Sequence, residues 1–224
     1  MILPDADKRK TPMPWVMYAP TFDKQLPSEK DEGWMIDQFL EAGIAILGVD
    51  VGESYGNPEG RKVYSALYDH LTKSKHSFAP KATLLARSRG GLMLYNWAVE
   101  NPDKVKCIAG IYPVCNIASY PGIRRAKDAY GMSEAELKAA LSEHNPIERL
   151  APLAKAGVEI FHIHGDVDKV VPLKANSQIV HDRYRKLGGQ MELVVPKGQG
   201  HNMWQGFFHC EALAKFVLDH SVKN

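Results

Sequence analysis

Short apolar runs alternate along the chain with segments whose apolar residues recur every three or four positions. The run at residues 44–49 is too continuously apolar to have one wet face, which is typical of a strand buried in a parallel sheet. Strands are predicted at residues 15–18, 44–49, 82–86, 105–112, 158–164 and 191–195. Helices are predicted at residues 31–42, 59–74, 91–100, 175–187 and 207–221. This alternation predicts an α/β fold, with a mostly parallel central sheet and helices on both faces.

Residues 116–151 interrupt the alternation because they contain no predicted strand. Ser133 and Glu136 have the spacing of a capping box, which predicts the start of a helix there. We interpret 116–151 as an insertion between two strands of one domain that spans residues 1–224. Loops at the carboxyl ends of parallel strands are where α/β proteins hold ligands. The insertion is therefore expected to be a lid or pocket wall, with a plain packing helix as the alternative.

Composition and charge narrow the class of protein. The 224 residues are 45% hydrophobic and 24% charged, with a net charge of +2, which is ordinary for a globular protein and favours no nucleic-acid partner. No apolar run approaches the ~20 residues that a membrane span needs, so no membrane partner is expected. Three cysteines leave at least one unpaired, which favours a reducing compartment. The oligomeric state is left open.

The first 14 residues are polar, basic and rich in proline, and they hold no apolar region of the signal-peptide kind. We therefore expect a cytoplasmic protein if the chain is complete. If an N-terminal signal has been removed, the expectation is a periplasmic or secreted protein.

A serine lies in the tight connection between the strand at 82–86 and the following helix, in the run ARSRGG at residues 86–91. A serine in so sharp a turn is held in a strained conformation with its hydroxyl exposed above the sheet. The turn needs small neighbours because the strand and helix backbones nearly touch, and Ala86, Gly90 and Gly91 supply them. These features predict a reactive Ser88, and the alternative is an ordinary turn with a capping serine.

An acid and a histidine follow this serine in the chain. The run HGDVDKVVP at residues 164–172 leaves the end of a predicted strand and contains Asp166 and Asp168. His201 lies just past the last predicted strand. Carboxyl ends of parallel strands meet at one edge of a sheet, so the serine, an acid and the histidine can converge there. Serine, acid and histidine in this order are typical of α/β hydrolases.

The chain resembles the α/β-hydrolase superfamily over nearly its whole length. It is most similar to the branch with dienelactone-hydrolase-like and prolyl-oligopeptidase-like domains, in which His-Gly-x-x-Asp-x-x-Val-Pro is typical. It departs from the usual Gly-x-Ser-x-Gly turn at Ala86. The resemblance implies that Ser88 is the nucleophile, that Asp168 rather than Asp166 is the acid, and that His201 is the base.

The resemblance also implies two backbone donors for the oxyanion of the transition state. The N–H of Arg89, directly after the nucleophile, is the first donor. The second donor is expected in the loop after the first strand, where Thr21 and Phe22 are the candidates. Pro20 has no N–H to donate.

Five further residues are candidates for contact with substrate. A guanidinium beside the nucleophile, from Arg87 or Arg89, can bind a substrate carboxylate, support the oxyanion or form a salt bridge under the lid. Glu53 and Tyr55 lie in a glycine-containing loop that is expected beside the same edge, where a structural turn is the alternative. Tyr120 lies in the insertion.

His162 and His164 lie on one face of a predicted strand, and Asp166 follows them. No third ligand group at a sensible spacing accompanies the two histidines, so no metal or other cofactor is expected. His164 is instead expected to brace the turn that presents Asp168. The remaining histidines are expected in solvent; they are His70, His76, His144, His181, His209 and His220.

These observations favour a cofactor-free serine hydrolase that cleaves a carboxylic ester through an acyl-enzyme on Ser88. A small-molecule or saccharide ester with a polar or anionic acyl group suits the arginines and the tyrosines Tyr55, Tyr120 and Tyr130. A serine peptidase of the prolyl-oligopeptidase type is the enzymatic alternative. From another class, a non-catalytic protein of the same fold that binds a ligand or partner is also open. A cofactor-free lyase or haloperoxidase is the third alternative.

Overall fold

A six-stranded sheet forms the centre of the described part of the molecule. A computed structural model describes residues 1–19, 27–73 and 77–222. All strands of this sheet are parallel, in the order β2-β1-β3-β4-β5-β6. They are β1 (Trp15–Ala19), β2 (Ala45–Leu47), β3 (Ala82–Arg87), β4 (Val105–Ile111), β5 (Glu159–Ile163) and β6 (Met191–Val194). The predicted fold class is confirmed, with each strand boundary within a few residues of its prediction.

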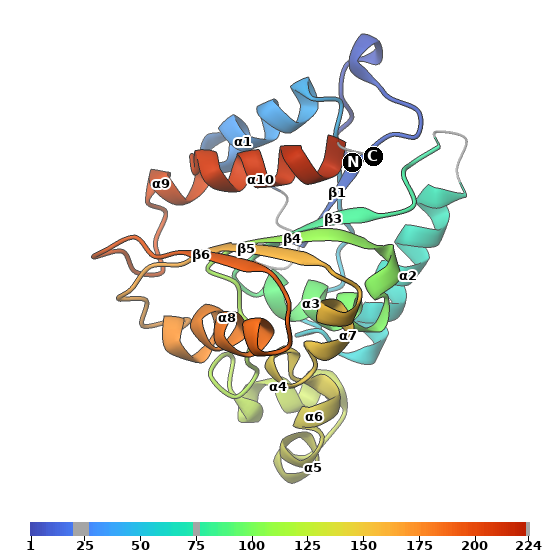
Figure 1. The fold of residues 1–224 in the computed structure, drawn as a ribbon. Helices are drawn as coiled ribbons and strands as arrows, with labels where there is room; N and C mark the ends of the chain where they lie inside the picture. The colour runs from blue at the N-terminus through green and yellow to red at the C-terminus, as the bar shows by residue number, and fades with distance from the viewer. Residues whose placement is uncertain (20–26, 74–76, 223–224) are drawn as a thin grey trace.

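Helices cover both faces of the sheet (Figure 1). On one face lie α1 (Glu29–Glu41), α9 (Gln205–Phe208) and α10 (Glu211–Val222). On the other lie α2 (Pro58–Thr72), α3 (Gly90–Glu100), α7 (Ala151–Lys155) and α8 (Ser177–Lys186). None of the helices described is both long enough and apolar enough to span a lipid bilayer.

Each face of the sheet is sealed by its own cluster of buried apolar side chains. The cluster beneath α1 and α10 includes Phe39, Phe161 and Val217. The cluster on the opposite face includes Trp97 and Tyr184, each with 1% or less of its surface exposed. Because both faces of the strands are buried, their sequences read as continuous apolar runs rather than as alternating ones.

The order of the strands predicts where a ligand would bind. The chain winds from β1 to β2 in one direction, and then continues from β3 through β6 on the other side of β1. The winding therefore reverses between β1 and β3, and open α/β sheets bind ligands beyond the carboxyl ends of the strands at such a switch point. Ser88 directly follows β3.

The last predicted helix, at residues 207–221, is divided in the structure into α9 and α10. The break lies at His209, whose backbone (φ −107°, ψ 33°) is no longer helical. The His209 ring stacks on Trp34 of α1, with 5.0 Å between ring centroids. A contact with a helix far away in the sequence thus accompanies a break that the apolar periodicity does not reveal.

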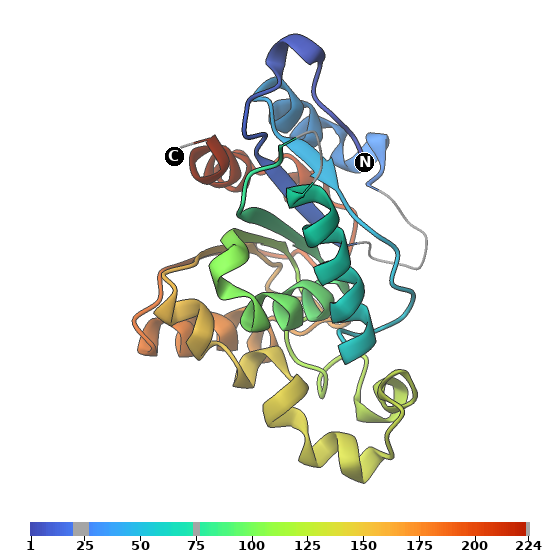
Figure 2. The ribbon, with the colours of Figure 1, turned by 90° about the vertical axis from the view of Figure 1, so that its right-hand side faces the viewer.

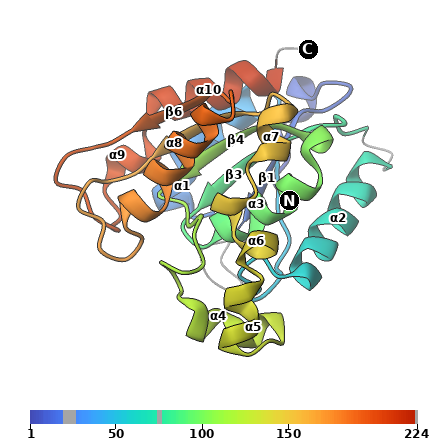
Figure 3. The same ribbon diagram turned by 60° about the horizontal axis from the view of Figure 1, so that its bottom comes forward.

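Residues 116–151 all belong to the described part of the chain, and they form no strand. They contain α4 (Ile123–Tyr130), α5 (Glu134–Ala139) and α6 (Leu141–His144), and the predicted capping box of Ser133 and Glu136 opens α5. Figures 2 and 3 show α4 and α5 on the side of the molecule away from α1 and α10. Leu137 and Ala126 are buried in a third apolar cluster together with Leu92 of α3.

His144, in this insertion, corrects a prediction. It was expected in solvent, but only 7% of its surface is exposed. Its Nδ1 lies 3.0 Å from an Arg61 guanidinium nitrogen, and its backbone carbonyl accepts a hydrogen bond of 2.8 Å from Asn96. The histidine is buried because the end of the insertion packs back against α2 and α3. His76 lies outside the described residues.

Candidate active site

A cavity of about 230 Å³ lies at the carboxyl edge of the sheet, beside Ser88. Ser88 follows β3, Tyr112 follows β4, and Val170 belongs to the loop after β5. His201 belongs to the loop after β6, and Tyr120 belongs to the insertion. The lining residues are Arg87, Ser88, Arg89, Tyr112, Tyr120, Val170, His201, Asn202 and Met203. Loops that are distant in the sequence therefore surround the predicted nucleophile.

The turn that carries Ser88 is as tight as the sequence predicts. Ser88 has φ +47°, a left-handed conformation that is uncommon outside glycine. A Cβ atom on Gly90 would lie 2.7 Å from the carbonyl oxygen of Ala19, and one on Gly91 would lie 2.3 Å from that of Val114. Both distances are too short for a side chain. The backbones of β1 and the segment after β4 thus require glycine at these two positions.

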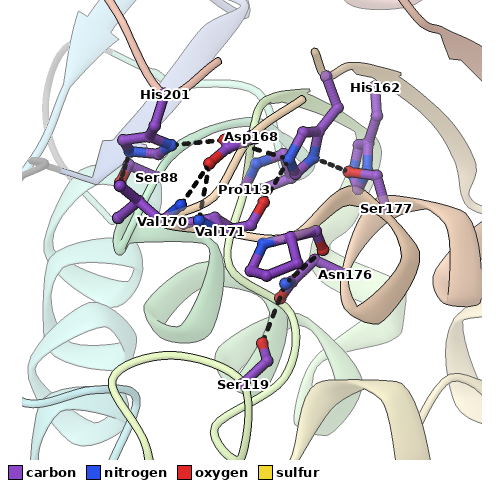
Figure 4. A network of polar contacts seen from close by, with 12 residues as sticks. Ser88, Pro113, Ser119, His162, Asp168, Val170, Val171, Asn176, Ser177 and His201 are labelled. Carbon is purple, nitrogen blue, oxygen red and sulfur yellow. Dashed lines mark hydrogen bonds and ion pairs between the residues drawn. The ribbon is translucent and has the colours of Figure 1, made fainter. Parts of the chain in front are cut away.

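Ser88, His201 and Asp168 form one chain of hydrogen bonds (Figure 4). The Ser88 Oγ lies 2.9 Å from His201 Nε2, and His201 Nδ1 lies 2.7 Å from Asp168 Oδ2. The other carboxylate oxygen of Asp168 accepts the backbone N–H groups of Val170 and Val171, at 2.9 and 2.8 Å. The structure therefore brings the three predicted residues together, in the geometry that nucleophilic catalysis by serine requires.

Asp166, the other acid of this segment, lies elsewhere. It is exposed, and its Oδ1 accepts a hydrogen bond of 2.7 Å from the backbone N–H of Gly198. The side chain of Asp168, by contrast, has no exposed surface. The geometry thus agrees with the choice of Asp168 that the family resemblance implies.

Asp168 is held as a carboxylate. Burial by itself works to raise the pKa of a carboxyl group. For Asp168 this effect is outweighed by hydrogen bonds from the side chains of His164 and His201 and from a backbone N–H group, which hold its pKa well below the usual 3.8. An ionised Asp168 can stabilise a positive charge on His201.

Arg87 forms a salt bridge, but its partner belongs to α1 and not to the insertion. Its guanidinium forms a 2.8 Å salt bridge with Glu32, a residue of α1 that is 1% exposed, and it also lines the cavity. It lies over the ring of Phe208, 4.9 Å from the centroid, and its second terminal nitrogen is 3.1 Å from the sulfur of Met203. Glu32 thus holds the guanidinium of a residue that lines the cavity.

Arg89 also lines the cavity, and its guanidinium pairs with Glu53. Neither Glu53 nor Tyr55 is among the residues that line the cavity. Tyr55 is buried in the apolar cluster of the insertion, and its carbonyl accepts a hydrogen bond of 2.8 Å from the Tyr130 hydroxyl. Of the predicted substrate-contacting residues, the structure therefore brings Arg87, Arg89 and Tyr120 to the cavity.

The structure describes Arg89, the first predicted oxyanion donor, but not the candidates for the second donor. Arg89 occupies the N-cap of α3, where backbone N–H groups point out of the helix. Thr21 and Phe22, the candidates for the second donor, lie outside the described residues.

Tyr112 is a site residue that the sequence reasoning missed. It has φ +37°, and its ring lies 4.4 Å from that of His201, measured between centroids. Its backbone N–H donates to the carbonyl of Ile163 in β5 at 2.8 Å. A tyrosine directly after a buried strand, followed by Pro113, was the available signal for it.

The His162–His164 pair, weighed above as a metal site, is occupied by internal hydrogen bonds. The Nδ1 atoms of both rings lie within 2.9 Å of the Ser177 hydroxyl oxygen. Asp166, the third member of the suspected grouping, is bound to Gly198 as described above. His164 Nε2 lies 2.8 Å from the carbonyl oxygen of Val171, consistent with the expectation that this residue braces the loop of Asp168.

The chain also matches a known protein family. A model of the prolyl oligopeptidase family matches residues 64–219 of the chain. A curated relative, the acylamino-acid-releasing enzyme of Arabidopsis thaliana, is 27% identical over 142 residues. This match covers 59% of the chain and 18% of the relative, so the chain spans less than a fifth of that protein.

Two solved structures illustrate the range of similar folds. Dipeptidyl peptidase 4 of Porphyromonas gingivalis superposes with a TM-score of 0.75 at 14% identity, covering 96% of this chain and 32% of that one. Est1E from Butyrivibrio proteoclasticus superposes with a TM-score of 0.70 at 19% identity, covering 99% of this chain and 93% of that one. At these identities the likeness supports the fold alone.

Replacing Asp168 by Asn tests the assignment of the acid. The amide no longer accepts the Nδ1 proton of His201 as a carboxylate does, so kcat for an activated ester such as p-nitrophenyl acetate should fall by roughly 10³- to 10⁴-fold. Asp166→Asn is the matched control and should keep the wild-type rate. A loss in Asp166→Asn with a normal rate in Asp168→Asn would reverse the assignment.

The pH dependence of stability tests the burial of His162. Burial, with His164 and His181 nearby, lowers the pKa of His162 from 6.5 to about 3. Between pH 6.5 and about 3, this histidine binds a proton in the unfolded chain but not in the folded chain. The free energy of unfolding is therefore highest above pH 6.5 and decreases as the pH falls. The slope from this residue is about 1.4 kcal/mol per pH unit.

We expect urea unfolding between pH 7 and pH 4.5 to have a shallower pH dependence in His162→Gln than in the wild type. His70→Gln, a change on an exposed residue of α2, controls for the loss of a histidine. Equal slopes for wild type and His162→Gln would contradict a neutral, buried His162.

Proposed function

Because the chain belongs to the prolyl oligopeptidase family and is a serine hydrolase, we propose that it cleaves carboxylic esters through an acyl-enzyme on Ser88. The acyl group is short and either polar or anionic. The alcohol is a small molecule or a saccharide. The choice of an ester bond rests on the cavity, because proteins of similar fold include peptidases as well as an esterase.

The observation that carries the choice of substrate is the charge around the cavity. Arg87 and Arg89 line it, and none of the described residues that line it is acidic. The carboxylates that pair with these arginines, of Glu32 and Glu53, do not line the cavity. A guanidinium recognises a carboxylate or another oxygen acceptor, whereas the free amino group of a peptide needs a carboxylate as its partner.

The volume of the cavity limits the acyl group. At about 230 Å³ it is smaller than the 300–1,000 Å³ that is typical of sites for drug-sized ligands. A short acyl chain with a polar or anionic end fits this space. Tyr120 of the insertion lines the cavity, so we assign residues 116–151 the role of a pocket wall.

The arrangement supports acylation of Ser88 through a tetrahedral intermediate. The Ser88 Oγ attacks the ester carbonyl carbon while His201 Nε2 takes the hydroxyl proton. The ionised Asp168 stabilises the resulting imidazolium through its hydrogen bond to Nδ1. We assign the backbone N–H of Arg89 to stabilise the oxyanion, and a donor of this kind is typically worth about 3 kcal/mol in the transition state.

The two products then leave in turn. When the tetrahedral intermediate collapses, the bond to the alcohol oxygen breaks and His201 returns the proton to that oxygen. A water molecule next loses a proton to His201 and attacks the acyl carbon. Collapse of the second intermediate releases the carboxylic acid and restores the hydroxyl of Ser88.

A serine peptidase is the second candidate. Similar proteins favour it, since they include an acylamino-acid-releasing enzyme and a dipeptidyl peptidase. The same catalytic groups can cleave an amide, so the two candidates differ in what the cavity binds rather than in the chemistry at Ser88.

A matched substrate panel separates the candidates. We expect kcat/KM for p-nitrophenyl hemisuccinate to exceed that for the neutral p-nitrophenyl butyrate by about tenfold, because a guanidinium can pair with the succinyl carboxylate. Both esters should exceed alanine p-nitroanilide by far. Faster cleavage of the anilide would favour the peptidase, and a preference for the neutral ester would contradict recognition of negative charge.

Two arginine variants control this experiment. Arg87→Lys keeps the positive charge but loses the planar fork of donors, so the preference for the anionic ester should fall. Arg61 is a buried arginine of α2 whose salt bridge is with Glu100, and it does not line the cavity. Arg61→Lys should therefore affect stability and leave the preference unchanged.

A further inference from the structure

Behind Asp168 lies a row of polar side chains that the catalytic steps above do not use. It consists of Tyr95 of α3, His162 of β5, Ser177 at the start of α8, and His164 directly after β5. Each of the four has 0% of its surface exposed. Figure 4 shows His162 and Ser177 in contact on the side of Asp168 away from Ser88. Buried polar groups are kept only where hydrogen bonds satisfy them, so the direction of each bond matters.

The contact between His164 and the carbonyl of Val171 determines which atoms donate along this row. His164 Nε2 is 2.8 Å from the carbonyl oxygen of Val171, which can only accept, so this nitrogen carries a hydrogen. In a neutral ring Nδ1 is then an acceptor, and it receives the Ser177 hydroxyl hydrogen over 2.8 Å. The serine oxygen in turn accepts from Nδ1 of His162 over 2.9 Å. Nε2 of His162 remains as the acceptor for the Tyr95 hydroxyl, at 2.7 Å.

A charged His164 would reverse this chain. It would donate from both nitrogens, so Ser177 would have to donate to His162, and His162 would donate to the oxygen of Tyr95. The Tyr95 hydrogen would then be left in the interior without an acceptor among the described residues. Leaving a buried donor unpaired costs about 1–3 kcal/mol, which favours the neutral ring.

The groups around His162 and His164 also favour a neutral His164. The ionisable groups that face His164 are Asp168 from its own loop and His162 from β5, with His201 on the far side of Asp168. Burial, together with His164 and His181 of α8, lowers the pKa of His162 to about 3. His162 is therefore neutral at any pH at which the protein works, as the chain of donors requires.

His164 contacts the loop of the acid at two points. Its Nε2 binds the carbonyl of Val171, whose N–H donates to Asp168 Oδ1, and the same Nε2 lies 3.4 Å from Asp168 Oδ2. A neutral His164 can thus orient the carboxylate without neutralising it. If His164 were positive, it would compete with a positive His201 for the same carboxylate.

We propose that His164 is a positioning residue for Asp168, and that Tyr95, His162 and Ser177 keep it neutral with its proton on Nε2. The negative charge of Asp168 is then left to stabilise the His201 imidazolium during catalysis. The kinetic part of this inference rests on the proposed function, whereas the protonation state of His164 does not.

Two substitutions at His164 separate positioning from packing. The amide nitrogen of Gln can occupy the place of Nε2, whereas the shorter side chain of Asn reaches only the place of Nδ1. We expect His164→Gln to keep kcat within about threefold of the wild type. In His164→Asn, kcat should fall by about tenfold or more with KM unchanged, because a misplaced acid slows the chemical step.

The rates are to be expressed per serine that reacts with a fluorophosphonate, so that a smaller folded fraction is not counted as a slower enzyme. His144→Gln, a change at a buried histidine outside this network, is the control and should leave kcat unchanged. Equal kcat values for His164→Gln and His164→Asn would overturn the positioning role.

The protonation state is measured directly by NMR of protein labelled with ¹⁵N in its histidines, using His164→Gln to assign the signals. We expect His164 to carry one proton, on Nε2, at pH 7.5. A doubly protonated His164 at this pH, or a proton on Nδ1 in place of Nε2, would overturn the proposal.

These measurements distinguish the two levels of inference. If the wild type does not cleave the esters but His164 carries a single proton on Nε2, the substrate is wrong and the network stands. If the esters are cleaved but His164 is charged, the proposed function stands and the network is wrong.

Discussion

A negative charge held away from water organises the candidate site. The side chain of Asp168 has no exposed surface, and a buried carboxylate is stable only where donors replace the lost water. Two backbone N–H groups of the loop after β5 satisfy one oxygen, and His201 satisfies the other. These bonds fix the loop, the loop fixes the imidazole, and the imidazole contacts Ser88. Strands β3, β5 and β6 end at one edge of the sheet, so the three residues that follow them lie close together.

The positive charge beside Ser88 is balanced by carboxylates from other parts of the chain. Arg87 and Arg89, on either side of the serine, are each paired with a carboxylate from a different part of the chain. Glu32 reaches Arg87 from α1, and Glu53 reaches Arg89 from the loop after β2. The pairs offset the cost of burying two guanidinium groups. Because neither carboxylate lines the cavity, the cavity itself presents donors rather than acids.

The sequence was sufficient to predict the strands and the turn at Ser88, because these depend on local properties: continuous apolar runs, and small residues at a tight turn. It could not predict the partner of Arg87, since Glu32 lies 55 positions away and contacts it only after α1 packs on the sheet. Tyr112 and the burial of His144 were missed for the same reason. Both depend on how separate segments pack, and no periodicity along the chain records that. The identity of the second oxyanion donor stays a prediction.

The central claim is that Ser88 is an activated nucleophile, and intact-mass measurement after incubation with a fluorophosphonate tests it most directly. An activated serine displaces fluoride and retains the phosphonyl group. The account predicts one phosphonyl adduct per chain in the wild type and none in Ser88→Ala. Folded wild-type protein without an adduct, or an adduct that persists in Ser88→Ala, would contradict it.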